Sequence, residues 1–142
     1  MYVDLQGLID RGWKGKLVQL TDRTNTPAST VDATVVARHI GDAASLIDSY
    51  LVKNYTLPLT AVPASLEKVA ADLAIYFIAG DTVEKDSAID RGYRDALRWL
   101  EQVARGQVAL EAEGIVPPAS GDGRVQLRGP DRIFSRDSLR GF

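Results

Sequence analysis

The residues best suited to recognition chemistry are eight side chains close to the C-terminus. Five of them are arginines spaced four apart, and three are large apolar residues among them: Arg124, Arg128, Arg132, Arg136, Arg140, Phe134, Leu139 and Phe142. A guanidinium group presents its donors in a rigid planar fork, and buried aromatic residues are common anchors of protein interfaces. The pattern therefore favours an arm that lies across another protein and holds it through these eight residues.

Other interpretations of this segment stay open. A single helix would bring the arginines near one face, but Gly129-Pro130 argues against a continuous helix. Binding to nucleic acid is less favoured, because the segment has no lysine and few aromatic residues for base stacking. A segment so poor in apolar residues is also compatible with a disordered tail.

The remaining candidates for catalysis or metal binding lack partners. The chain has one histidine, His39, and no cysteine, so paired-histidine sites, thiolate nucleophiles and cysteine metal sites cannot form within one chain. Asp72 and Asp48 flank apolar helical stripes, and we expect each to accept a structural hydrogen bond. Tyr93, Tyr50 or an arginine would donate to Asp72. We therefore expect no enzyme activity, no cofactor and no metal site.

An acidic cluster precedes the last predicted helix and is formed by Asp81, Glu84, Asp86 and Asp90. It lacks the oxygen-ligand spacing and the turn glycine of a calcium loop. Negative side chains are favourable at a helix N-terminus, so we interpret the cluster as structural. Opposite charges four residues apart follow it, at Asp90–Arg94, Arg91–Asp95 and Glu101–Arg105.

Charge divides the chain into two parts. Residues 1–120 carry twelve Lys and Arg against sixteen Asp and Glu, a net charge of −4, whereas residues 121–142 carry five arginines against three aspartates, a net charge of +2. The join from Pro117 to Gly123 has the composition of a linker. We therefore predict a body over residues 1–116 and a basic arm over residues 117–142. We expect neither a membrane helix nor a secretion signal.

Apolar periodicity predicts an all-α body. Val36, Ile40, Ala43, Ile47 and Tyr50 follow the spacing of one helical face and indicate a helix over about 31–55. Similar stripes predict helices from about Pro63 past Phe77 and over about 83–105, and short helices are expected over 3–10 and 17–20. Short loops favour antiparallel neighbours. The expected fold is a small antiparallel bundle of three long helices and short N-terminal helices, followed by an extended C-terminal arm.

Six segments, taken in order, resemble a known family. They are Leu17–Asp22, Ala43–Leu51, Tyr55–Leu59, Ala70–Tyr76, Tyr93–Gly106 and Phe134–Phe142. The chain resembles the small virion proteins of Mu-like phages and prophages, which are similar to the head–tail connector, or adaptor, proteins of long-tailed phages. One departure is Asn54, where the resemblance suggests an arginine and a salt bridge.

This resemblance implies a non-enzymatic subunit of a ring, with about twelve copies, at the head–tail neck of the virion. The implied partners are the portal protein, neighbouring copies and a downstream neck or tail protein. The resemblance also implies that the arm reaches the portal, while DNA passes through the ring without specific binding. Two alternatives stay open: a neck or tail-completion protein that contacts the tail, and a small DNA-binding regulator.

Overall fold

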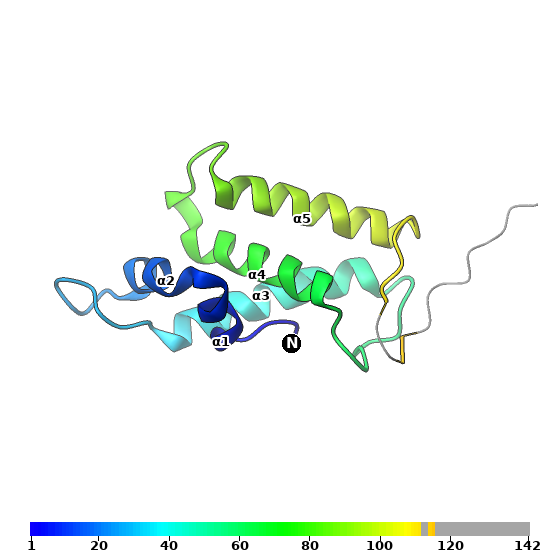
Figure 1. Cartoon of the computed structure of the whole chain (residues 1–142), viewed down its shortest axis with the longest axis horizontal. Helices are drawn as coiled ribbons and strands as arrows, with labels where there is room; N and C mark the ends of the chain where they lie inside the picture. The colour runs from blue at the N-terminus through cyan, green and yellow to red at the C-terminus, as the bar shows by residue number, and fades with distance from the viewer. Residues whose placement is uncertain (112–113, 116–142) are drawn as a thin grey trace, which may run out of the picture.

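The structure, a computed structural model, describes residues 1–111 and 114–115, and every regular element within them is helical. The elements are α1 (Leu5–Leu8), α2 (Lys14–Thr21), α3 (Ala33–Leu51), α4 (Ala64–Ala79) and α5 (Ala88–Ala104). A wide turn over Ile9–Trp13 joins α1 to α2, and a short turn over Gly80–Thr82 follows α4. The three long helices α3, α4 and α5 pack together, and each runs antiparallel to the one before it (Figure 1). The predicted all-α bundle is confirmed; the predicted arm over 117–142 lies outside the described residues.

Helix α4 lies at the centre and is buried on most of its surface. Its buried residues are Leu66, Val69, Ala70, Ala71, Leu73, Ala74, Ile75, Ile78 and Ala79. Helices α3 and α5 pack against it, and α2 also contacts it. The sequence pattern predicted an apolar stripe on one side of α4, and the observed buried surface is wider than that stripe. Small alanine side chains on the other faces allow neighbouring helices to approach closely.

The flanking helices bury one face each. In α3 the buried face is Val36, Ile40, Ala43, Ile47 and Leu51, so Leu51 takes the place that the sequence pattern gave to the half-buried Tyr50. Helix α5 buries Ala96, Leu100 and Val103 and turns its charged side to solvent. A helix that buries one face keeps its apolar stripe toward the core and its polar side chains on the opposite face.

Two long helices are shorter than predicted. Helix α3 begins after Asp32, whose carboxylate accepts from the Thr34 and Val35 amides, and it ends at Leu51 rather than near Tyr55. There the Asn54 and Tyr55 amides both donate to the Leu51 carbonyl, at 3.0 and 2.9 Å, which turns the chain.

Helix α5 begins at Ala88 rather than near 83, because Ser87 caps it by accepting from the Asp90 amide. Asp86, with a positive φ of 61°, lies in the turn before this cap. The acidic cluster therefore lies mostly ahead of the helix, with Asp90 alone in its first turn.

One carboxylate organises the loop between α2 and α3. Asp22 accepts from the backbone amides of Thr24, Asn25, Ser29 and Thr30, and also from side chains of Thr24, Asn25 and Thr30. These donors, first the Ser29 and Thr30 amides, hold the pKa of Asp22 well below its usual range. At the base of the loop the buried Thr21 hydroxyl donates to the Leu17 carbonyl and accepts from the Asp32 amide. The loop projects from one end of the bundle with a defined shape (Figure 1).

The first prediction tests the central helix. Leu73→Asp places an unpaired charge at a fully buried position of α4, which costs about 3–5 kcal/mol, a large part of the stability of a small domain. We expect loss of cooperative thermal unfolding, measured by circular dichroism. The matched control Ser65→Asp, at an exposed first-turn position of the same helix, keeps a near-native melting temperature. A near-native melt for Leu73→Asp contradicts the assignment of α4 as the core.

The second prediction concerns Asp22. A carboxyl group whose pKa is lowered in the folded state contributes stability above its unfolded pKa of about 4, and this is lost as pH falls through the folded pKa. Carboxyl-carbon NMR is therefore expected to show Asp22 still ionised at about pH 3, with the Ser29 and Thr30 amides still protected. Titration of Asp22 near pH 4 contradicts the hydrogen-bond network of the loop.

Candidate functional site

The structure describes the segment that leads into the arm, residues 105–111 and 114–115, which we call the arm root. All eight predicted contact residues, Arg124, Arg128, Arg132, Phe134, Arg136, Leu139, Arg140 and Phe142, lie outside the described residues. The chain that leads to them leaves α5 at Ala104 and passes along the loop between α3 and α4. Leu110 in this stretch is fully buried, and Ile115 packs against the core.

Two residues of the α3–α4 loop fasten this root. The Leu110 amide donates to the Tyr55 hydroxyl at 2.9 Å, in a buried hydrogen bond. The Asn54 Nδ2 donates to the carbonyls of Val103 and Ala104, at 3.1 and 2.8 Å. The last carbonyls of a helix have no partner within the helix. Asn54 donates to two of them, and the Val103 carbonyl also accepts from the Gly106 amide at 3.0 Å.

This role accounts for Asn54, the position at which the resemblance suggested an arginine. The carboxamide supplies donors to carbonyl oxygens, so the salt bridge considered for this position is replaced by hydrogen bonds to the end of α5. Sequence reasoning identified the position as unusual but did not predict its partner, because the partner carbonyls lie about fifty residues away in sequence.

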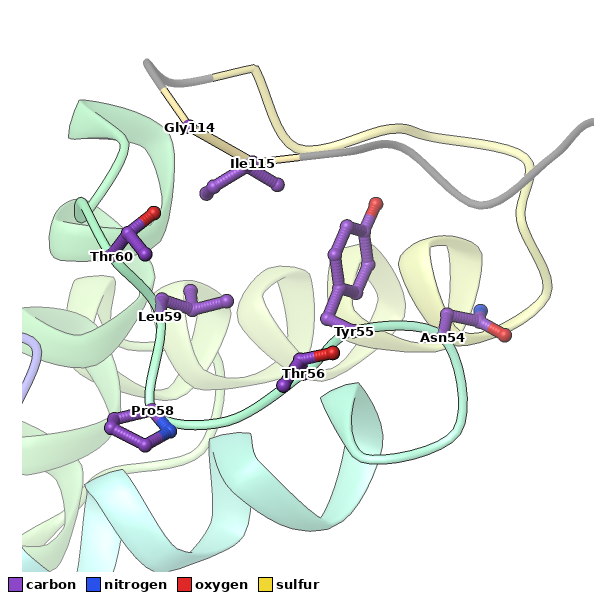
Figure 2. A pocket seen from close by; sticks show the side chains of 8 residues that line it. All are labelled: Asn54, Tyr55, Thr56, Pro58, Leu59, Thr60, Gly114 and Ile115. Atoms are coloured by element: carbon purple, nitrogen blue, oxygen red, sulfur yellow. The ribbon is translucent and has the colours of Figure 1, made fainter.

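A surface pocket of about 190 Å³ lies between the α3–α4 loop and the root. Figure 2 shows Asn54, Tyr55, Thr56, Pro58, Leu59 and Thr60 on one side and Gly114 and Ile115 on the other. Gly114 has a φ of 80°, and a Cβ added to it would lie 2.9 Å from the Thr60 hydroxyl oxygen. A glycine is therefore needed where the root passes this loop.

A second hollow of about 350 Å³ adjoins the first. Met1, Tyr2, Asp48, Leu57, Pro58, Leu59 and Val62 line it, so Pro58 and Leu59 belong to both hollows. The Tyr2 hydroxyl donates to Asp48 Oδ1, which fastens the N-terminal segment to α3. Burial, together with this hydrogen bond and the charge of Asp48, raises the pKa of Tyr2 well above its usual value. The structural role expected for Asp48 is thus observed, with a donor that the sequence did not identify.

The other candidate residues have structural partners. His39 Nδ1 lies 3.4 Å from Asp42 Oδ2 at the surface of α3. Asp72 accepts from Lys68 Nζ at 2.6 Å, so the expected donors Tyr50, Tyr93 and arginine were wrong. Tyr93 instead stacks on Tyr76, with ring centroids 3.7 Å apart, and burial raises its pKa.

The charged face of α5 follows the predicted pairing in part. Arg94 contacts Asp86 at 2.6 Å and Asp90 at 2.9 Å, and Glu101 lies 3.7 Å from Arg105. The expected Arg91–Asp95 pair does not form. Arg91 donates to the Asp86 carbonyl, while Asp95 contacts Arg98 at 3.2 Å. Exposed pairs of this kind contribute little stability.

The described residues contain neither a cluster of metal ligands nor a membrane-spanning helix. In residues 1–111 and 114–115, no three His, Cys, Asp or Glu side chains gather as metal ligands. No helix of this part of the chain has the length and apolar character needed to cross a bilayer. Trp13 and Trp99 are half-buried against the core.

Comparison with known proteins assigns the chain to a family. The family model described as Bacteriophage Mu, Gp36 matches residues 2–127. "Gene product J" of Escherichia phage Mu is 32% identical, with 99% of this chain and 98% of that protein aligned. "Mu-like prophage FluMu protein gp36" of Haemophilus influenzae is 32% identical, with 81% and 80% covered. This chain is a phage protein and belongs to the Bacteriophage Mu Gp36 family.

Proposed function

We propose that this protein is a non-enzymatic structural component of the virion, a head–tail connector subunit. In this proposal the helical bundle forms a ring beneath the portal, with about twelve copies, and the arm over residues 117–142 docks on the portal protein. A downstream neck or tail protein meets the ring on its far side. DNA passes through the channel without specific binding.

The observation that carries the proposal is the fastening of the arm root. Tyr55 holds Leu110, and Asn54 holds the end of α5, so the chain enters the arm from a fixed point at one end of the bundle. A fixed origin reduces the ordering entropy that a recognition segment loses when it binds. A body that sets the origin of a basic arm is suited to present that arm to a partner.

Assembly into a ring strengthens the binding of such an arm to its partner. One short segment binds weakly because its residues must be ordered, but linked copies act together and raise the overall affinity without new contacts. A closed ring requires a heterologous interface, in which one face of each subunit meets a different face of the next. The exposed charged face of α5 offers one surface for such an interface.

The charge distribution supports a channel that releases DNA. Residues 1–120 have a net charge of −4, and affinity for phosphate backbones grows with the number of lysine and arginine contacts. A ring built of acidic bodies therefore retains DNA weakly, while the basic arms are directed to protein. A mainly basic channel surface in an assembled ring contradicts this part of the proposal.

The third prediction tests portal binding. Replacing Arg124, Arg128, Arg132, Arg136 and Arg140 with glutamine is expected to weaken capture by purified portal at least about tenfold, because each forked donor pair to a partner carboxylate or carbonyl is lost. The control replaces Arg23 and Arg38, which are exposed on the body and lie outside the arm root, and retains binding. Capture by purified tail protein instead of portal favours the tail-completion alternative. A salt-sensitive gel shift with DNA favours the regulator, and either result contradicts the portal role.

The fourth prediction tests the root. Tyr55→Phe keeps the buried ring but removes the acceptor of the Leu110 amide, which costs about 1–3 kcal/mol for an unsatisfied buried donor. We expect faster hydrogen exchange at Leu110 and weaker portal capture, with the α4 amides unchanged. Unchanged exchange at Leu110 contradicts the anchoring role.

A further inference from the structure

Exposed apolar side chains gather at the end of the bundle where the arm begins. We define the loop-end patch as Met1, Leu57, Pro58, Leu59 and Val62, which line one hollow together. Met1 is 80% exposed and Val62 is 40% exposed, and both are among the most exposed large apolar residues in the described part of the chain. An apolar surface of this kind is usually covered by a binding partner.

The position of the arm root indicates what covers the patch. Ile115 lies across the first pocket from Leu59, and Leu59 also belongs to the loop-end patch. The chain continues beyond this point for 27 residues, which reach about 90 Å when fully extended. The arm therefore starts beside the patch and is long enough to cross it.

The chemistry of the arm matches that of the patch. Residues 117–142 carry Val125, Leu127, Ile133, Phe134, Leu139 and Phe142 among five arginines. Acidic side chains border the patch: Asp48 lines its hollow, and Asp4 and Glu67 line a neighbouring hollow that shares Met1 and Tyr2. Each of the three carboxylates already has one contact within the chain: Glu67 with Arg11 at 2.9 Å, Asp48 with Tyr2, and Asp4 with the Gly7 amide at 2.7 Å. An arginine of the arm would add to these contacts.

We propose that in the free protein the arm lies on the loop-end patch of its own chain. Covalent linkage gives the arm a high effective concentration at a patch that adjoins its root, which favours this occupant over a second copy at low protein concentration. The arm then leaves the patch when it binds an external partner. The inference goes beyond the proposed function, because it holds whichever partner the arm meets.

The absence of cysteine allows a direct test by paramagnetic NMR. A nitroxide attached through Ser138→Cys in the full-length chain is the only label site. We expect loss of methyl signal at Leu57, Leu59 and Val62, with the Leu17 and Val36 methyls unaffected. The control is a mixture of two kinds of chain. One carries the nitroxide at natural isotope abundance, and the other is isotope-labelled and carries no nitroxide. We expect no signal loss in this mixture. Broadening that persists in the mixture, or that spares the patch, overturns the proposal.

A matched pair of substitutions tests the patch itself. Val62→Lys places a positive charge in the patch, which removes an apolar contact and repels the arginines of the arm, whereas Val52→Lys changes a valine that is 66% exposed and lines neither hollow. In the nitroxide-labelled chain, Val62→Lys is expected to restore the Leu57 and Leu59 signals, and Val52→Lys to leave them broadened. Equal effects of the two substitutions overturn the proposal. Unchanged core methyl signals verify that both variants fold, and neither measurement uses the portal.

Discussion

The structure depends on the burial of α4 between its neighbours. Leu66, Leu73 and Ala74 on this helix are fully buried, and α3 and α5 pack against it while α2 covers a further side. A helix this apolar is stable only in the middle of a bundle, so it fixes the order of the layers. The amphipathic helices on either side then keep their polar faces in solvent, where they are available to other molecules.

This arrangement places the features that suit recognition at the two ends of the bundle. The loop organised by Asp22 projects from one end, and the α3–α4 loop with the arm root lies at the other (Figure 1). The Asp22 loop is fixed by polar contacts, whereas the arm root combines the hydrogen bond from Leu110 to Tyr55 with burial of Leu110 in the core. Such contacts give a loop a defined shape at the surface, which lowers the entropy that a recognition segment loses when it binds.

The sequence predicted the helices better than the contacts between their ends. Periodicity was sufficient for α3, α4 and α5, because burial repeats along one face every three or four residues. It missed the ends at Leu51 and Ala88, which depend on local turns and on the Ser87 cap. The sequence also missed three hydrogen-bonded contacts, because each joins residues about fifty positions apart and carries no local signal. They are Tyr2–Asp48, Asn54–Val103 and Tyr55–Leu110. The need for a glycine at position 114 is also visible only in the structure, where Gly114 passes close to Thr60.

The most direct test of the account is a cryo-electron microscopy reconstruction of this chain mixed with purified portal protein. The account predicts a closed ring of helical bundles whose α3–α4 ends are turned toward the portal, with residues 117–142 in contact with portal side chains. A ring that meets the portal through the Asp22 loop, with residues 117–142 directed to the tail, would contradict it.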